Sequence, residues 1–98
     1  MGYLAEALRE QSKVLQSLIT LSLSNNYIRD KGMGYLVEAL QEQPQALQNL
    51  KELDLGSNRI GNEGMLYLAK VLIDKPQTLQ FLKELNLSSN YIGVVGIH

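Results

Sequence analysis

The side chains best suited to chemistry in this chain are carboxylates, because it has no cysteine and a single histidine, His98. Glu52 and Glu84 draw most attention, since they occupy the same place in two similar segments and two adjacent carboxylates can act as a catalytic pair. A catalytic carboxyl group needs a pocket that raises its pKa, and these two belong to alternating segments that predict an open strand surface. No Ser/His/Asp set, phosphate-binding loop or metal-ligand cluster can be assembled elsewhere. We therefore expect a protein that is not an enzyme and uses no cofactor or metal.

Three segments that repeat every 32 residues set the positions of those carboxylates. Each reads L-x-x-L-x-L-x-x-N-x-I, and they begin at Leu18, Leu50 and Leu82 without an insertion or deletion between them. A fixed period of this length is typical of stacked units, none of which buries its apolar face alone. We therefore expect residues 1–98 to form a single domain of about three 32-residue units.

Each unit is predicted to contain one strand and one helix. The L-x-L core of each segment alternates with polar residues, which predicts strands with one buried face near 20–24, 52–56 and 84–88. Apolar residues at helical spacing predict helices near 1–11, 31–42 and 63–74. Because a helix links each strand to the next, the strands must be parallel and joined by right-handed crossovers.

The helix boundaries and buried faces follow from particular residues. We expect Asp30 and Asn62 to be N-caps, because their side-chain oxygens can accept bonds from free backbone N–H groups. Proline has no N–H and its ring clashes with the preceding turn, so the helices must end before Pro44 and Pro76. The residues expected to share a buried helix face are Leu36, Val37 and Leu40 in one helix and Leu68, Ala69 and Leu72 in the other.

These motifs resemble leucine-rich repeats over essentially the whole chain. The G-x-x-x-L-x-x-x-L continuation, as in Gly32, Leu36 and Leu40, resembles the ribonuclease-inhibitor-like subclass, which also occurs in cytosolic immune receptors and bacterial effectors. The resemblance implies an α/β leucine-rich-repeat solenoid, a right-handed β-α superhelix with parallel strands on the concave side and helices on the convex side. It also implies that the asparagine column satisfies backbone groups in the turn after each strand. The members of that column are Asn26, Asn58 and Asn90.

Composition narrows the classes of partner and location. The formal net charge is −1, and the sequence has no polybasic run, which argues against nucleic acid or an anionic membrane as the main partner. No apolar stretch is long enough to span a bilayer. The absence of cysteine fits a reducing compartment. We therefore expect a cytoplasmic protein, or a secreted bacterial effector that acts in a host cytosol.

The polar strand positions are the best candidates for binding, since they project away from the helices onto the concave side. Neighbouring strands lie about 4.8 Å apart, so these residues form side-by-side rows. The middle of the face is small and acidic, which predicts a protein partner with a basic segment, although an ordinary solvated face is the alternative interpretation. We expect Lys51 and Lys83 to offset the repulsion between the two glutamates by diagonal pairing. The rows are Thr20, Glu52 and Glu84; Ser22, Asp54 and Asn86; and Ser24, Gly56 and Ser88.

A further row follows the strands, formed by Tyr27, Arg59 and Tyr91. Stacked repeats would place the arginine between two tyrosines, in a cation–π arrangement worth about 0.5–1 kcal/mol when exposed. Tyrosine and arginine are enriched at binding hot spots, so the row is a candidate for partner contact. The alternative is a self-satisfied ladder that stiffens the rim of the repeats.

The two ends of the sequence lack the polar caps that repeat proteins need for solubility. An open last strand and bare apolar flanks favour pairing with further chain. Two interpretations remain: the chain is a fragment of a longer protein, which we favour, or copies stack end to end. The main functional prediction is thus a protein–protein interaction module that binds its partner on the concave strand face. The alternative is a self-assembling module.

Overall fold

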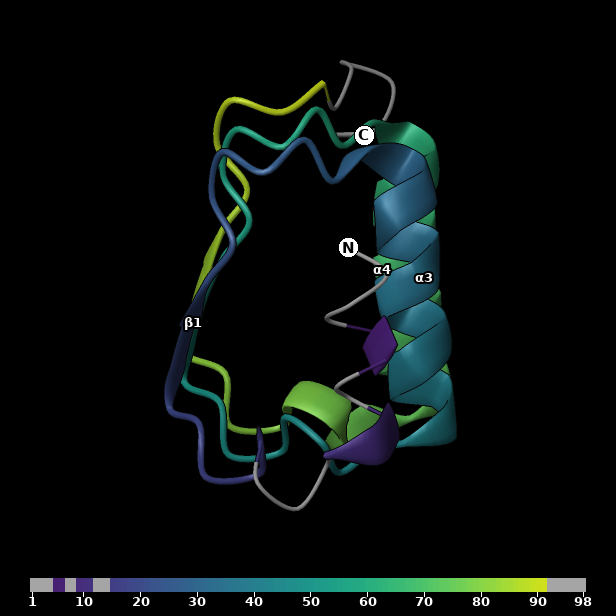
Figure 1. Cartoon of the computed structure of the whole chain (residues 1–98), viewed down its shortest axis with the longest axis vertical. Coiled ribbons are helices and arrows are strands. Elements are labelled where there is room, and N and C mark those ends of the chain that lie inside the picture. Colours follow the sequence, from purple (N-terminus) through teal and green to yellow (C-terminus); the bar gives the residue numbers. More distant parts are fainter. Residues whose placement is uncertain (1–4, 7–8, 12–14, 92–98) are drawn as a thin grey trace.

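The computed structural model describes residues 5–6, 9–11 and 15–91, and its strands and helices alternate along the chain (Figure 1). The predicted helix ends at Glu42 and Asp74 are confirmed. The helix expected near 1–11 falls partly outside the described residues; of that segment, 5–6 and 9–10 are helical. The order is β1 (Thr20–Ser22), α3 (Arg29–Glu42), β2 (Glu52–Asp54), α4 (Asn62–Asp74), the 3₁₀ turn η1 (Pro76–Leu79) and β3 (Glu84–Asn86).

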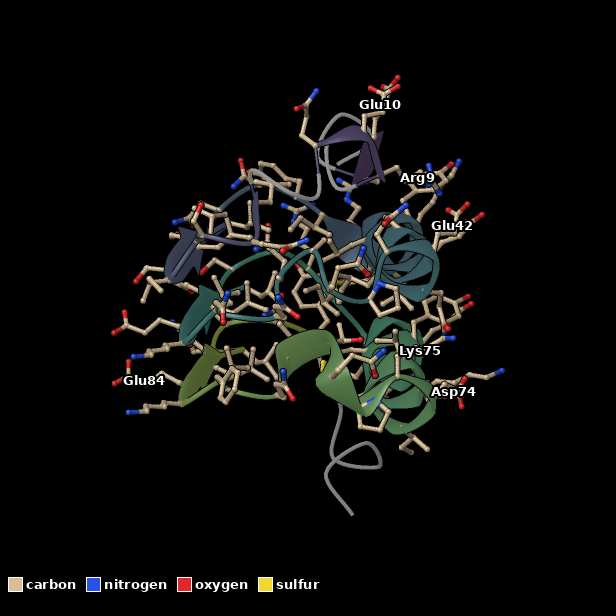
Figure 2. All side chains as sticks on the ribbon, turned by 90° about the horizontal axis from the view of Figure 1, so that it is seen from below. Arg9, Glu10, Glu42, Asp74, Lys75 and Glu84 are labelled. Carbon is tan, nitrogen blue, oxygen red and sulfur yellow. The ribbon has the colours of Figure 1, made fainter. Side chains whose placement is uncertain are left out.

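The strands form one layer and the helices form a second layer on the opposite side of the molecule (Figures 1 and 2). β2 lies between β1 and β3 and pairs with both in parallel, as the helical connections required. The register sets Leu21 beside Leu53 and Leu53 beside Leu85, so equivalent leucines of successive repeats are neighbours. The predicted α/β repeat with a parallel sheet is confirmed.

The strands are shorter than predicted, with three residues each in place of five. The ladder nevertheless continues beyond them, because the N–H of Leu23 donates to the carbonyl of Asp54 at 2.8 Å and that of Asn25 to Gly56 at 3.0 Å. Asn25 has a φ of 60°, so the backbone leaves the extended conformation while its hydrogen bonds still join the repeats. Ser57 and Ser89, the equivalent residues, have φ values of 56° and 57°.

The core lies between the two layers and is densest in the middle repeat. Leu53 is 4% exposed and Leu55 and Ile60 are fully buried, whereas Leu85 of the last strand is 38% exposed. A middle unit in a stack is covered by a neighbour on each side, which accounts for this gradient.

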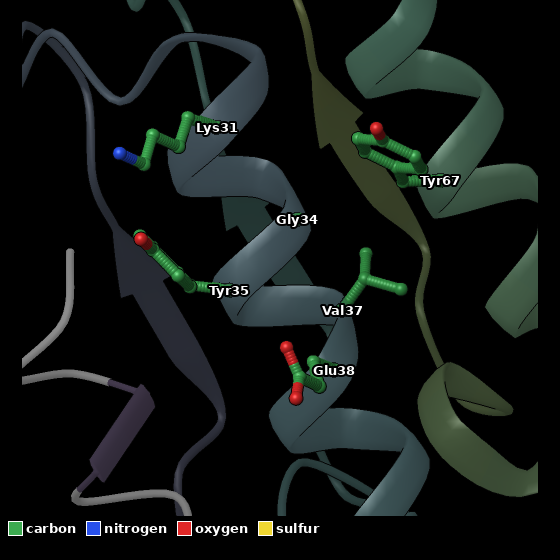
Figure 3. A pocket seen from close by; sticks show the side chains of 6 residues that line it. All are labelled: Lys31, Gly34, Tyr35, Val37, Glu38 and Tyr67. Carbon is green, nitrogen blue, oxygen red and sulfur yellow. The ribbon is translucent and has the colours of Figure 1, made fainter.

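The predicted burial of one helix residue is wrong. Leu36, Val37 and Leu40 are buried as predicted, but Ala69 of α4 is exposed. Its counterpart Val37 lies on the side of α3 that faces α4 (Figure 3). Within the described residues, no further helix covers α4 on the corresponding side.

The predicted N-caps are also wrong, and Asp30 bonds the start of the next repeat's helix instead of its own. Asp30 is the second residue of α3 and Asn62 the first residue of α4, so neither precedes its own helix. Asp30 Oδ1 instead accepts hydrogen bonds from the N–H groups of Gly61 at 2.7 Å and Gly64 at 2.9 Å, at the start of α4. A carboxylate there also interacts favourably with the positive end of the helix dipole. Asp30 therefore joins the first repeat to the helix of the second.

This contact explains why the repeat needs a glycine at Gly64. A Cβ atom at that position would lie 2.7 Å from Asp30 Oδ1 and 2.7 Å from Ile60 Cγ2. Ile60 is fully buried and Asp30 is held by its two bonds, so neither neighbour can move easily. The column glycine is thus required by close approach between repeats.

Candidate functional site

The outer row of the strand face consists of exposed residues from the three strands. The sheet register places Thr20 beside Glu52 and Glu52 beside Glu84, as predicted. All three are exposed, and Glu84 points away from the helices (Figure 2). We call Glu52 and Glu84 the acidic pair.

The acidic pair forms no ion pair with any residue that the structure describes. The ion pairs in that part join Arg9 to Glu38 and to Glu42, on the helix side. The predicted diagonal pairing of Lys51 and Lys83 with the acidic pair is therefore wrong. Both lysines are exposed like the glutamates that follow them, but neither forms an ion pair with a carboxylate of a described residue. The two carboxylates stand together as like charges, which destabilises the sheet slightly.

The middle row is bonded within itself. Asp54 Oδ1 accepts a bond from the N–H of Gly56 at 2.9 Å and another from Asn86 Nδ2 at 3.0 Å. Asn86 Oδ1 accepts in turn from the N–H of Ser88 at 2.9 Å. These polar groups already have partners, so they are less available to a ligand than the acidic pair is.

The third row lies beyond the strand ends and closes the face. Gly56 is buried, and a Cβ there would approach Asp54 Oδ1 to 3.1 Å and Ser88 Oγ to 3.4 Å. In the first repeat, the hydroxyls of Ser22 and Ser24 lie 3.4 Å apart. The outer and middle rows together form one open hollow of about 240 Å³, and its lining residues are Thr20, Leu21, Ser22, Glu52, Leu53, Asp54, Glu84 and Asn86.

The asparagine column joins the repeats, as expected. Asn58 is fully buried, and its Oδ1 accepts bonds from the N–H groups of Asn26 at 2.8 Å and Ile28 at 3.3 Å in the preceding repeat. Its Nδ2 donates to the carbonyls of Leu23 at 2.8 Å, Leu55 at 3.0 Å and Gly56 at 3.1 Å. Asn90 repeats the arrangement, accepting from the N–H groups of Asn58 and Ile60, each at 2.9 Å. The column is structural and offers no free group to a ligand at its buried member.

The row after the strands forms a second hollow, of about 230 Å³, at the rim of the strand face. The Arg59 guanidinium carbon lies 4.7 Å from the ring centroid of Tyr27. Tyr91 lines the same hollow, but among the described residues the ring contacts of Arg59 are with Tyr27 alone. The structure thus brings the three residues together and gives one of the two expected stacking contacts. The full lining is Asn25, Tyr27, Ser57, Arg59, Ser89 and Tyr91.

Comparison with known families agrees with this geometry. The family model described as leucine-rich repeat matches residues 14–37, 46–69 and 78–97. The chain belongs to the leucine-rich repeat family. The three matches begin 32 residues apart, at the spacing seen in the sequence and in the stacked strands. No curated protein matches the chain. Leucine-rich repeats are generally protein-interaction modules and typically have no catalytic activity.

The helix side of these leucine-rich repeats has a feature that the sequence did not predict. A hollow of about 360 Å³ lies over α3 and α4 (Figure 3), and Lys31, Gly34, Tyr35, Val37, Glu38 and Tyr67 line it. The Tyr67 hydroxyl donates to Glu63, and this bond raises the pKa of Tyr67. Gly34 leaves room for the Tyr67 ring, whose nearest atom would lie 3.6 Å from an added Cβ. The 32-residue spacing of Tyr35 and Tyr67 was the available signal.

Metal-ligand clusters and membrane-spanning helices are both absent from the described part of this leucine-rich repeat chain. Residues 5–6, 9–11 and 15–91 hold no group of three or more His, Asp or Glu side chains suited to a metal ion. Their helices are all too short or too polar to cross a bilayer.

Proposed function

We propose that the chain binds a protein partner on its strand face, as the concave side of a leucine-rich-repeat solenoid. The acidic pair carries the proposal, because it consists of two exposed like charges side by side that form no ion pair with a described residue. Stability alone would not select this arrangement. A partner that places a cation between the two carboxylates would remove their repulsion.

The chemistry of the face favours a partner with a basic segment. The outer and middle rows form an open hollow in which Asp54 is already bonded, so the acidic pair supplies the free acceptors. A lysine or arginine side chain would bond both carboxylates, and the negative patch would also steer a basic segment toward the face.

A lysine peptide tests this proposal directly. We would measure binding of a fluorescent, acetylated hexalysine peptide by anisotropy at low and at physiological salt. The double variant Glu52→Gln/Glu84→Gln should weaken binding about tenfold or more, because both free carboxylates are lost. The matched control is Glu10→Gln/Asp74→Asn, which removes the same charge from exposed positions near the helices (Figure 2). If both variants weaken binding equally, the peptide responds to net charge and the strand face is not the site.

The helix lengths support assignment to the ribonuclease-inhibitor-like subclass. α3 has 14 residues and α4 has 13, so a full α-helix follows β1 and β2. In such repeats the helices are wider than the strands, which curves the stack and makes the strand face concave.

End-to-end self-assembly is the second candidate, favoured by one observation. On the outer side of α4, Leu66 is 68% exposed and Ile73 is 77% exposed, and both line an apolar hollow of about 440 Å³. It occupies the place in the second repeat that the hollow over α3 and α4 occupies in the first, where Gly34 is the residue equivalent to Leu66. A second copy that stacked there would bury the leucine and isoleucine.

Light scattering over a hundredfold concentration range tests this candidate. Self-assembly predicts a mass that rises with concentration and falls back in Leu66→Lys, whereas a constant 11.0 kDa would reject it.

A further inference from the structure

We call the hollow that Tyr27, Arg59 and Tyr91 line at the edge of the strand face the rim hollow. We propose that the rim hollow binds the carboxylate of an acidic side chain, presented by a peptide segment of the partner. Arg59 is the group that would hold the carboxylate, with Tyr27 and Tyr91 beside it. This site lies outside the acidic pair and has the opposite charge preference.

The first support is the state of Arg59. Its guanidinium is exposed and stacks on the Tyr27 ring at 4.7 Å, a contact that uses the face of the group. The N–H donors lie at the edge of a guanidinium, and Arg59 makes no hydrogen bond or ion pair with any described residue. The tyrosine therefore restrains the side chain, and the guanidinium donors have no partner among the described residues. A restrained guanidinium loses less entropy when it binds an anion.

The second support is the set of polar groups around Arg59. Ser57, Ser89 and Asn25 line the same hollow, and none of their side chains bonds to another group in the described part of the chain. Asn58, which follows Ser57 in the chain, differs from these residues because both its amide oxygen and its amide nitrogen are bonded. The hollow thus combines one cation with hydroxyl and amide donors and has no carboxylate in its lining.

Charge and shape select the class of ligand. Arg59 is the one charged residue that lines the hollow, and a carboxylate carries a single negative charge that it can bond through two parallel N–H···O contacts. Tyr27 and Tyr91 are both exposed and would pack against the methylene groups of a glutamate side chain. An acidic peptide residue satisfies all of these features.

The inference adds to the proposed function a second charge on the partner. The rim hollow follows directly after the strand face, since Asp54 and Arg59 are five positions apart. A partner that carries a basic residue for the acidic pair and an acidic residue nearby would engage both. The carboxylate site stands without the acidic pair, so each can fail alone.

The chain offers a sharp spectroscopic test because it has three arginines, Arg9, Arg29 and Arg59. We would follow their Nε–H resonances by ¹⁵N NMR while adding acetyl-Ala-Glu-Ala-amide, and repeat the titration with the Gln peptide and with inorganic phosphate. The Arg59 signal should shift and saturate with the Glu peptide. The other two serve as internal controls: Arg9 is already paired with Glu38 and Glu42, and Arg29 lies 6.0 Å from the Tyr27 ring outside the hollow lining.

Variants separate recognition from simple attraction. Arg59→Lys keeps the charge but lacks the two parallel donors, so it should bind the Glu peptide about tenfold more weakly. Arg29→Gln should leave binding unchanged. Glu52→Gln/Glu84→Gln should also keep it, while losing the lysine peptide, which separates failure of this site from failure of the strand-face proposal.

Three results would overturn the carboxylate site: equal shifts with the Glu and Gln peptides, parallel shifts of all three arginines, or a response of Arg59 to phosphate without one to the Glu peptide. The wild-type titration alone decides among these, so the test does not depend on the folding of any variant.

Discussion

Asn58 and Arg59 are neighbours in one turn and are used in opposite ways. Asn58 is fully buried and its amide bonds five backbone groups in two repeats. Arg59 is exposed, stacks on Tyr27, and donates to no group in the described part of the chain. In the three repeats the first position is always asparagine, whereas the second is Tyr, Arg and Tyr. The inward position holds the repeats together, whereas the outward one differs between repeats and is the position for which we propose binding.

The backbone of the turn produces this division. Asn25 and Tyr27 have left-handed φ values of 60° and 51°. The residue that follows each of them, Asn26 and Ile28, donates its N–H to Asn58 Oδ1. N–H groups that converge in a turn of this kind form a concave site for a negatively polarised oxygen. Left-handed backbone costs about 1–2 kcal/mol per non-glycine residue, and the asparagine bonds offset this cost.

The largest effect should follow removal of the inward amide. Asn58→Ala would leave buried N–H and carbonyl groups without partners, and each such group costs about 1–3 kcal/mol, so we expect a loss of about 3 kcal/mol. Urea unfolding followed by circular dichroism measures it. Asn26→Ala is the control, because Asn26 is exposed and water can replace its bonds; its loss should be about 1 kcal/mol. Equal losses in the two variants would mean that burial does not set the strength of the column.

The column glycine should give the next largest effect. Gly64→Ala forces a Cβ against Asp30 Oδ1 and Ile60 Cγ2, and overpacking of this kind costs about 1–3 kcal/mol. Gly34→Ala is the matched control, since it is also a helix glycine but its Cβ would meet the Tyr67 ring at an ordinary 3.6 Å. Helix propensity should make that variant more stable by about 0.5–1 kcal/mol. Changes of the same sign in both variants would contradict the close-approach explanation.

The asparagine column and the glycine column also show how far the sequence could predict the structure. The 32-residue period predicted the parallel register, and Pro44 and Pro76 predicted the helix ends at Glu42 and Asp74. The bonding of the asparagine column was implied by the resemblance to leucine-rich repeats, and the sequence alone did not show that Asn58 bonds both repeats. The period did not predict that Asp30 caps the helix of the next repeat, because capping rules consider a helix and the residues next to it in the chain. The polar column of Asp30 and Asn62 beside the glycine column was the signal for a contact across repeats.

The candidate site was predictable in outline and less so in its contacts. Alternation in the strands placed Glu52 beside Glu84 correctly. The expected pairing of Lys51 and Lys83 with the glutamates was wrong, since an ion pair depends on rotamers that strand spacing alone does not give. The bonding of Asp54 to Gly56 and Asn86 depends likewise on rotamers and on the turn after the strand.

The contact across repeats can be tested apart from the glycine. Asp30→Ala removes the acceptor for the N–H groups of Gly61 and Gly64, and loss of a helix cap costs about 1 kcal/mol. Asp30→Asn keeps an acceptor oxygen and should lose only the part due to charge, about 0.3–1 kcal/mol. Urea midpoints of the three proteins should therefore fall in the order wild type, Asn variant, Ala variant. An Ala variant as stable as wild type would show that water caps α4 equally well.

The smallest effect on stability should come from the outward position. Arg59→Gln removes the stacking contact with Tyr27, and an exposed cation–π contact is worth about 0.5–1 kcal/mol at most. The same substitution removes the guanidinium that would bind a carboxylate, so binding should fall far more than stability. If Arg59→Gln instead lowers stability as much as Asn58→Ala does, the row of Tyr27, Arg59 and Tyr91 is a ladder that stiffens the rim. Arg59 would then serve stability through its contact with the Tyr27 ring, and the carboxylate site would lose its support. A small loss of stability together with lost binding would mean that two adjacent residues of one turn divide its work, with cohesion at Asn58 and recognition at Arg59.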